Sequence, residues 1–340
     1  MPSSTGASQS LKTFNSFGID IDAGDYMAIS EEKQIPELLE KNKNIFLLGG
    51  GSNILFTEAP KQLLVHIKTK GKKIVNESET HVDIEVQAGE NWHEFVLWCI
   101  ENNFGGLENL ALIPGSVGAS PMQNIGAYGV EVKDSIQRVY FYDISSVTKK
   151  SLTNAQCDFA YRSSIFKKSL KGKIIISSVV FRLTKSAHKI NRAYGVINQR
   201  LEELGTDKDP NISDIAKAVI SIRKEKLPDP KVMGNAGSFF KNPVIDKEAY
   251  QSLIAQYPEM PSYAVENKFK IPAAWLIDQC GLKGFEQNGA AVHMGQPLVL
   301  INKYGTASGD AILNLAKHVQ SQVFDKFGVS LDMEVNIYKG

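Results

Sequence analysis

The chain has 340 residues, of which 43% are hydrophobic and 22% charged, values typical of a globular protein that needs no disulfide or metal to fold. Its 38 basic and 37 acidic residues leave a net charge of +1, which argues against a protein that coats nucleic acid or an anionic membrane. The three cysteines form no CxxC pair, and the six histidines show no HxxxH or HExxH spacing, so we expect no metal site.

The first ten residues, MPSSTGASQS, are polar and lack the apolar centre of a secretory signal. No apolar run approaches the length of about 20 residues that spans a bilayer. We therefore expect a cytoplasmic protein with a disordered leader over residues 1–11.

Short apolar runs at 45–48 and 63–67 predict strands, and residues 82–88 alternate between apolar and polar like a strand with one solvated face. Residues 91–103 predict a helix, with Asn91 as its N-cap. Residues 105–129 then hold six glycines and few charges; long segments of this kind inside a domain are more often functional than idle.

Strands are predicted again at 136–142 and 173–183, followed by a polar stretch, 185–231, with a helix near 213–224. The Pro-Asp-Pro sequence at 228–230 marks a domain boundary.

The C-terminal part predicts a helix near 272–280, a longer helix over 309–327 that ends at Gly328, and a last strand over 329–338. The strands are short and alternating and lack regular βαβ spacing, so the pattern favours an α+β fold over a doubly wound parallel sheet.

Two glycine-rich segments could bind a nucleotide. Gly49, Gly50 and Gly51, followed by Ser52 and Asn53, come directly after a predicted strand and could present backbone amides to a pyrophosphate. Taken alone, this segment is more often a glycine turn, and it matches neither the Rossmann nor the P-loop pattern.

The second segment, 113–129, has closely spaced small residues that would let a flat ring or a phosphate lie against the backbone, although a long structural loop is the simpler interpretation. The pair of segments suggests a dinucleotide. By their residue types alone, Arg162, Ser238 and Glu334 would be a surface arginine, a turn serine and an exposed strand carboxylate.

Taken together, the segments resemble one family. GGGSNIL, LENLALIPGSVGASPMQNIGAYG, YRSSIFK, KLPDPKVMGNAGSFFKNP, WLIDQCGLKG, GAAVHMGQPLVLIN and LDMEVNIY occur in the order typical of UDP-N-acetylenolpyruvoylglucosamine reductases, flavoenzymes of peptidoglycan precursor synthesis. The resemblance runs from Phe14 to Tyr338. Two positions depart from it: Asn288 replaces a glycine, and Ser16 replaces a threonine. Asn tolerates a left-handed backbone, so we expect the first change to be mild.

The resemblance implies a two-lobed FAD-binding domain of the vanillyl-alcohol-oxidase (PCMH) type and a C-terminal α+β substrate-binding domain. The implied domains are a leader (1–11), the FAD-binding domain (12–187, lobes about 12–70 and 71–187), a connecting segment with a tyrosine loop (188–231), and the substrate-binding domain (232–340). The last strand would return Glu334 to the site.

The resemblance also assigns residues. FAD would be held by Gly49, Gly50, Gly51, Ser52, Asn53, Pro114, Gly115, Ser116, Gly118, Ala119, Asn124 and Gly126. The UDP-sugar would contact Tyr194, Lys226, Asn242 and Gln296, as in the subtype with a tyrosine loop over the substrate.

In the chemistry that the resemblance implies, NADPH delivers hydride to flavin N5, and the hydride then passes to C3 of UDP-N-acetylglucosamine enolpyruvate in the same cleft. Arg162 and Glu334 would stabilise the enolate that develops on the substrate carboxylate, and Ser238 would protonate C2. Activation by a monovalent cation and action as a monomer are also expected. The remaining alternatives are a flavoprotein oxidase on the same fold and a nucleotide-sugar binding module without flavin.

Overall fold

The computed structural model describes residues 8–340. The chain divides into two compact units. Of the described residues, unit 1 comprises 8–9, Ala23–Gly50 and Pro60–Glu225, and unit 2 comprises Ser10–Asp22, Gly51–Ala59 and Lys226–Gly340. None of the described helices combines the length and the apolar character that crossing a bilayer requires.

The boundaries of these units differ from those of the domains implied by the resemblance. Residues 10–22 and 51–59 group with the C-terminal part, and the segment expected to connect two domains groups with unit 1 as far as Glu225. A long-range strand pair explains part of this difference: β5 (Ile54–Phe56) lies parallel to β21 (Asn336–Tyr338), near the end of the chain.

The predicted leader is wrong for residues 8–11, and its first seven residues lie outside the described part of the chain. Leu11 is fully buried, and its amide donates to the Ile21 carbonyl at 2.8 Å. Next to it, β1 (Gln9–Ser10) pairs with β2 (Asp22–Ala23). The polar composition of residues 1–10 gave no indication that Leu11 would be buried.

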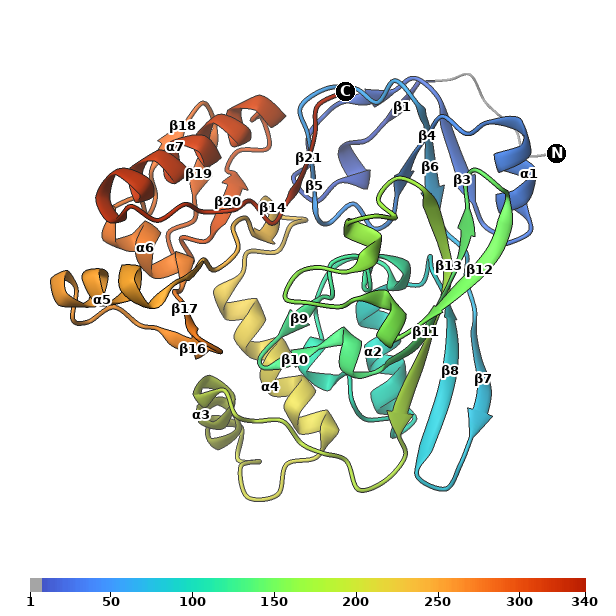
Figure 1. The fold of residues 1–340 in the computed structure, drawn as a ribbon, viewed down its shortest axis with the longest axis horizontal. Helices are drawn as coiled ribbons and strands as arrows, with labels where there is room; N and C mark the ends of the chain where they lie inside the picture. The colour runs from blue at the N-terminus through green and yellow to red at the C-terminus, as the bar shows by residue number, and fades with distance from the viewer. Residues whose placement is uncertain (1–7) are drawn as a thin grey trace. The chain divides into compact units, whose positions relative to one another are not determined.

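The larger sheet of unit 1 has five antiparallel strands in the order β12-β11-β13-β8-β7 (Figure 1). Their bounds are β7 (Lys72–Glu77), β8 (His81–Gln87), β11 (Ile136–Asp143), β12 (Thr148–Thr153) and β13 (Ile174–Thr184). The predicted strands at 82–88, 136–142 and 173–183 are thereby confirmed. The apolar residues of β8 enter the core, whereas its polar residues face the other side, where the Arg182 guanidinium covers Asp83.

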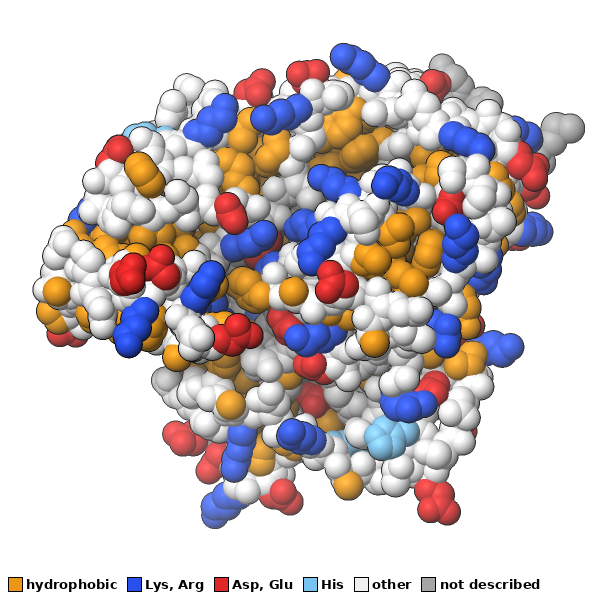
Figure 2. All heavy atoms as spheres, in the orientation of Figure 1, with side chains coloured by type: hydrophobic (Ala, Val, Ile, Leu, Met, Phe, Trp, Pro, Cys, Tyr) orange, Lys and Arg blue, Asp and Glu red, His pale blue; other side chains and the backbone are white. Residues whose placement is uncertain are grey.

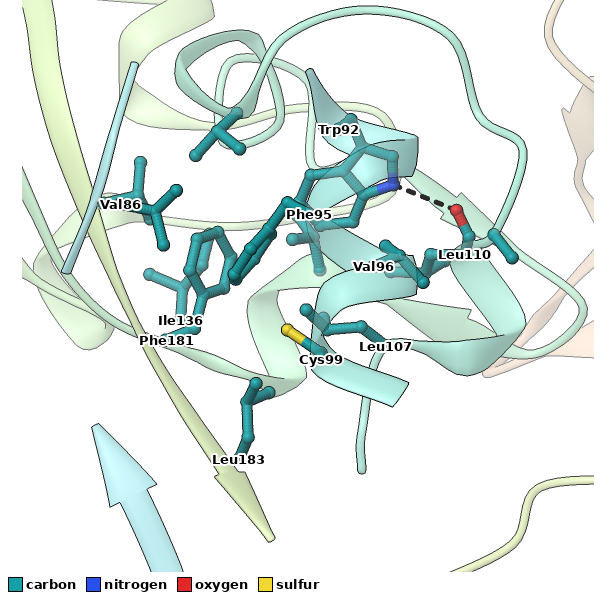
Figure 3. Packing of buried hydrophobic residues seen from close by; sticks show 14 of the residues in the cluster. Val86, Trp92, Phe95, Val96, Cys99, Leu107, Leu110, Ile136, Phe181 and Leu183 are labelled. Atoms are coloured by element: carbon teal, nitrogen blue, oxygen red, sulfur yellow. Dashed lines mark hydrogen bonds between the residues drawn. The ribbon is translucent and has the colours of Figure 1, made fainter. Parts of the chain in front are cut away.

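Helix α2 (Trp92–Glu101) packs on the apolar face of this sheet. It begins as predicted, because the Asn91 side chain accepts a hydrogen bond from the Glu94 amide at 3.0 Å. Figure 3 shows Phe95 beside Phe181, with ring centroids 5.1 Å apart, and the indole N–H of Trp92 donating to the Leu110 carbonyl. This bond fastens the start of the glycine-rich segment to the core.

A second, three-stranded sheet lies in the N-terminal part of unit 1. Its order is β3-β6-β4, and both pairs are parallel. The bounds are β3 (Tyr26–Ile29), β4 (Ile45–Leu48), β6 (Leu63–Ile67) and the covering helix α1 (Gln34–Lys41). The runs predicted as strands at 45–48 and 63–67 thus end at the residues expected, and the first leads directly into the Gly49–Asn53 segment.

Two helices close unit 1. Helix α4 (Ile212–Lys226) confirms the helix predicted near 213–224, and α3 (Gly195–Leu204) precedes it. Both bury apolar residues in the core beneath the five-stranded sheet. The short pair β9 (Gly126–Ala127) and β10 (Val130–Glu131) projects from the glycine-rich segment.

Unit 2 contains a four-stranded sheet in the order β14-β20-β19-β18, all antiparallel. Its strands are β14 (Gly234–Ser238), β18 (Glu286–Gln287), β19 (Ala290–Val292) and β20 (Val299–Asn302). Helices α6 (Ala273–Gln279) and α7 (Gly309–Phe327) contribute to its core. Helix α7 has the predicted bounds, with Ser308 as N-cap and Gly328 as its left-handed C-cap. Helix α5 (Lys247–Gln256) lies with a small sheet of β15 (Val244–Ile245), β16 (Tyr263–Val265) and β17 (Lys268–Lys270).

The predicted last strand over 329–338 is wrong for most of its length, because only Asn336–Tyr338 forms a strand. The predicted alternation of buried and solvated residues is present, since Val329, Leu331 and Val335 are buried. This segment lacks a continuous partner strand, however, and before β21 its only paired position is an isolated bridge from Met333 to Phe240 among the described residues.

Charged side chains of both signs are mixed on the surface. Figure 2 shows basic and acidic side chains interspersed on the visible face rather than gathered by sign. This distribution agrees with the near-zero net charge.

Candidate active site

The two glycine-rich segments meet within unit 1. Gly50 lies so close to Gly115 that a Cβ atom built on Gly50 would be 2.6 Å from the Gly115 Cα. A Cβ atom on Gly49 would similarly be 2.8 Å from the Ser116 hydroxyl oxygen. Residue types larger than glycine would force these segments apart. The two segments suggested as a dinucleotide site are therefore in contact.

Backbone hydrogen bonds to the strand–helix junction of β8 and α2 hold the second segment in place. The Trp92 amide donates to the Gly115 carbonyl at 3.0 Å, and the Val117 amide donates to the Glu90 carbonyl at 2.9 Å. The Glu90 carboxylate is itself buried and accepts from the Gly71 amide, which with Lys70 and Lys72 lowers its pKa against the opposing effect of burial. This corner is thus rigidly tied to the sheet.

The contact between the segments leaves donors available to an anion. Across residues 8–340, the backbone amides of Gly50, Gly115 and Ser116 donate to no protein acceptor. Amides without a partner at glycine-rich corners are the groups that bind phosphate oxygens. These residues therefore fit the pyrophosphate of FAD.

The remaining residues expected to hold FAD are placed as follows. Gly51–Asn53 belong to unit 2, where the Ser16 amide donates to the Gly51 carbonyl at 3.0 Å and the Ser16 hydroxyl to the Ser52 carbonyl at 3.4 Å. Serine therefore supplies the hydroxyl that the usual threonine would supply. Pro114, Gly118 and Ala119 lie in the anchored segment of unit 1. Asn124 is fully buried, and its side-chain oxygen and nitrogen both bond to protein groups.

Arg162 lies in a tight turn of unit 1. The amides of Ala160 and Ser163 each donate to the other's carbonyl at 3.0 Å, and Arg162 adopts a left-handed backbone with φ of 53°. One Nη atom of its guanidinium donates to the Gly126 carbonyl at 2.8 Å. Non-glycine residues rarely adopt positive φ, and such conformations cluster at functional sites.

Ser238 ends β14 in unit 2. The register of β14 against β20 shifts between Asn235 and Ser238, and Ser238 is exposed while Phe239 and Phe240 are fully buried. Irregularities of this kind re-aim side chains. Here the irregular strand end presents a hydroxyl to solvent.

The structure brings Glu334 next to Ser238 along the backbone. The Glu334 amide donates to the carbonyl of Phe239 at 2.8 Å, and the Asn53 side chain donates to the Glu334 carbonyl at 3.4 Å. Within unit 2, a residue near the end of the chain therefore lies beside both the serine strand and the glycine-rich segment. Arg162 belongs to unit 1.

Of the residues expected to contact the UDP-sugar, Tyr194 lies in unit 1, directly before α3, and is 45% exposed. Its ring is perpendicular to that of Tyr128, with centroids 6.0 Å apart. The other three belong to unit 2. Lys226 is the exposed last residue of α4, and the Asn242 Oδ1 accepts from the first amide of α6 at 2.9 Å. The Gln296 amide donates to His293 Nδ1 at 3.1 Å.

Two further residues, Tyr128 and Arg223, lie beside the residues predicted for the site and were not singled out from the sequence. Burial raises the pKa of Tyr128, and the positive charge of Arg223 opposes this shift. The Arg223 Nε donates to the Leu112 carbonyl at 3.3 Å, and burial lowers the pKa of its guanidinium. The signal for Tyr128 was its place inside the glycine-rich segment, beside the residues already singled out.

Comparison with known proteins agrees with this geometry. Residues 32–145 match the FAD binding domain family, and residues 229–338 match the C-terminal domain of UDP-N-acetylenolpyruvoylglucosamine reductase. The reductase of that name from Flavobacterium johnsoniae is 49% identical over 96% of this chain and 98% of its own length. The corresponding Neisseria gonorrhoeae reductase is 46% identical over 96% of this chain and 95% of its own length.

The fold has a solved counterpart. The crystal structure of UDP-N-acetylenolpyruvylglucosamine reductase from Thermus caldophilus gives a TM-score of 0.69 at 20% identity and covers 98% of both chains. These matches confirm the expected α+β fold, with an FAD-binding domain and a separate C-terminal domain. The chain therefore belongs to the UDP-N-acetylenolpyruvoylglucosamine reductase family.

Proposed function

We propose that this chain reduces UDP-N-acetylglucosamine enolpyruvate to UDP-N-acetylmuramate with NADPH, a step of peptidoglycan precursor synthesis. Near-complete coverage of relatives that carry the reductase name supports the activity. The structural observation that supports it is the backbone contact between the segments that carry Ser238 and Glu334, the 2.8 Å bond from the Glu334 amide to the Phe239 carbonyl. A hydroxyl and a carboxyl group on adjoining segments suit a reaction that protonates one carbon while charge develops on a neighbouring carboxylate.

FAD, when bound, supplies the redox chemistry, because it accepts hydride from NADPH and returns it to the enolpyruvyl group. The amides of Gly50, Gly115 and Ser116 would hold its pyrophosphate. Their donors are fixed before FAD arrives, since the Trp92 amide already fastens the Gly115 carbonyl. Fixed donors bind phosphate without a further cost of ordering the chain.

Three side chains act on the substrate in this proposal. Arg162 places a permanent positive charge beside the substrate carboxylate, where negative charge grows during the addition of hydride at C3. Ser238 gives its hydroxyl proton to C2. Glu334 donates a second hydrogen bond to the same carboxylate, which requires the protonated carboxyl group.

The nucleotide part of the substrate would contact the remaining residues. Lys226 is an exposed cation suited to the diphosphate, and Asn242 retains its side-chain NH2 group after capping α6. Tyr194 would close over the sugar nucleotide, and Gln296 would add a further polar contact. We also propose that the enzyme works as a monomer in the cytoplasm, with monovalent cations as activators.

An anaerobic visible spectrum tests the proposal. The purified protein is recorded alone, after NADPH, and after UDP-N-acetylglucosamine enolpyruvate. Bleaching by NADPH and recolouring by the enolpyruvyl sugar would support it. Recolouring by oxygen but not by the sugar would favour a flavoprotein oxidase. A protein that stays colourless with added FAD would favour a nucleotide-sugar binding module.

A further inference from the structure

Asn124 bonds to two structural elements that hold Arg162, the turn that carries it and the short β9–β10 pair. Asn124 is fully buried, and its backbone has a φ of 48°, so its side chain projects from a constrained left-handed position. Its Nδ2 atom donates to the Ala160 carbonyl at 3.1 Å and to Glu131 Oε2 at 3.0 Å. Its Oδ1 atom accepts from the Lys133 amide at 3.1 Å.

The first of these contacts fixes the backbone of Arg162. Ala160 is the residue at which the Arg162 turn closes, through the reciprocal hydrogen bonds with Ser163. The neighbouring Ser164 hydroxyl is also buried and donates to the Met122 carbonyl at 2.6 Å. The turn is thereby bound at two points to the segment that contains Asn124.

The second contact fixes the acceptor of the Arg162 guanidinium. That acceptor is the Gly126 carbonyl, and Gly126 pairs with Glu131 across β9 and β10. A Cβ atom on Gly126 would lie 3.1 Å from an Arg162 Nη atom, so the guanidinium lies against this strand. Asn124 therefore bonds to the strand opposite Gly126 and to the turn that carries Arg162.

We propose that Asn124 is a positioning residue that holds the Arg162 guanidinium at the place where the substrate carboxylate becomes charged. The inference rests on the role of Arg162 in the proposed function. The side-chain amide of Asn124 is consumed by protein partners, so the role assigned here differs from direct contact with FAD. A group that acts through charge must be placed accurately, and an error of about 1 Å can cost about 100-fold in rate.

Asn124→Gly tests the proposal, because glycine keeps the left-handed backbone and removes only the side chain. The matched control is Asn103→Gly, which removes an asparagine of the same unit with φ of 57° and its two hydrogen bonds, to the Lys185 carbonyl at 3.0 Å and with His188 Nε2 at 3.1 Å. The two half-reactions of the FAD-bound protein are followed by stopped-flow absorbance. We expect Asn124→Gly to slow oxidation by the enolpyruvyl substrate about 10- to 100-fold and to leave reduction by NADPH within about twofold. We expect Asn103→Gly to alter neither rate.

A double-mutant comparison separates the proposal from its premise. Arg162→Ala alone should slow oxidation by the enolpyruvyl substrate, and an unchanged rate would overturn the role of Arg162 itself. In the Arg162→Ala background, Asn124→Gly should have no further effect on that rate. Loss of FAD, equal slowing of both half-reactions, or the same added loss in both backgrounds would overturn the positioning role.

If Asn124→Gly yields no folded protein, Asn124→Asp takes its place in the same measurements. Aspartate keeps the side-chain volume and the acceptor for the Lys133 amide but loses the donors to Ala160 and Glu131. The same selective loss is expected. An oxidation rate equal to that of the unsubstituted enzyme would overturn the proposal.

Discussion

The amide of Glu334 donates a hydrogen bond to the carbonyl of Phe239 at 2.8 Å. This bond joins segments that are nearly 100 positions apart and brings the backbone of Glu334 to the residue that follows Ser238. It lies where the C-terminal segment passes the end of β14, before that segment forms β21. The backbones that carry the two proposed catalytic residues are thus held together.

Replacing Ser238 should separate the two half-reactions. In Ser238→Ala, we expect reduction by NADPH to be nearly unchanged and oxidation by the enolpyruvyl substrate to slow at least about 100-fold, since only the second step needs a proton at C2. Stopped-flow absorbance at the flavin bands measures both rates. Ser321→Ala, which changes an exposed serine of α7 in the same unit, is the control. Equal losses in both half-reactions would contradict the proton-donor role.

Adding a methyl group to Gly50 should weaken the binding of FAD. The new Cβ atom in Gly50→Ala would meet the Gly115 Cα at 2.6 Å, so the two segments must move apart and their amides must diverge. We expect at least a tenfold rise in the Kd for FAD, which corresponds to about 1.4 kcal/mol. Gly24→Ala is the control, because a Cβ atom at Gly24 meets nothing within 4 Å. Equal flavin content in both variants would count against this site.

Tyr194 should act mainly on substrate binding. Its ring is 45% exposed and contacts the Tyr128 ring, so its hydroxyl can reach a ligand without disturbing the core. In Tyr194→Phe, we expect KM for the UDP-sugar to rise several-fold while the reduction rate with NADPH stays unchanged, because one hydrogen bond contributes about 1 kcal/mol. Steady-state kinetics with varied UDP-sugar provides the measurement, and Tyr304→Phe, at another exposed tyrosine, is the control. An unchanged KM for the UDP-sugar would contradict the proposal that Tyr194 closes over the sugar nucleotide.

Sequence patterns predicted the helix bounds best where capping residues mark both ends of the helix. Helix α7 could be predicted to the residue because Ser308 caps it and Gly328 adopts the left-handed conformation that ends it. Helix α5 was not predicted, although Tyr250, Leu253 and Ile254 form an apolar stripe at helical spacing, of which only Leu253 is buried. The C-terminal alternation gave the correct buried residues but could not reveal that most of the segment lacks a partner strand.

The sequence was enough to predict which residues belong to the candidate site, but not which of them contact one another. The resemblance identified Arg162 and Asn124, yet their connection through Ala160 depends on a turn that closes far along the chain from the glycine-rich segment. Likewise, the approach of Gly50 to Gly115 depends on how β8 and α2 fasten the second segment. Such contacts arise from tertiary packing, which a single sequence does not display.

The departure at Asn288 should be nearly neutral. Asn288 and Gly289 have φ of 53° and 76° and join β18 to β19 in a two-residue turn, the arrangement that favours Asn-Gly. The expectation that asparagine tolerates this position is confirmed by its left-handed backbone. We expect Asn288→Gly to change the free energy of unfolding by less than about 0.5 kcal/mol and Asn288→Ala to lower it by about 1 kcal/mol. Urea denaturation measures both, and equal stability of the two variants would contradict the argument.

His66 should make the stability of the protein fall in mild acid. Its Nδ1 lies 3.0 Å from the Tyr26 hydroxyl in the three-stranded sheet, and burial, with the charge of Lys68, lowers its pKa to about 4. An unfolded histidine has a pKa of about 6.5, so the unfolded state binds the proton more readily between these values. The contribution of His66 is therefore complete above about pH 6.5 and is lost as the pH falls toward 4.

Urea denaturation at pH 7.5 and pH 5.0 measures this loss. The His66→Asn variant keeps a side-chain acceptor for the Tyr26 hydroxyl and cannot titrate in this range. We expect the unsubstituted protein to lose about 1 kcal/mol more than this variant between the two pH values, a figure reduced for the partial solvent exposure of the ring. The carboxylates that also titrate are common to both proteins and cancel in the comparison. If both proteins lost the same free energy of unfolding between the two pH values, the pKa of His66 would be the same in the folded and the unfolded state.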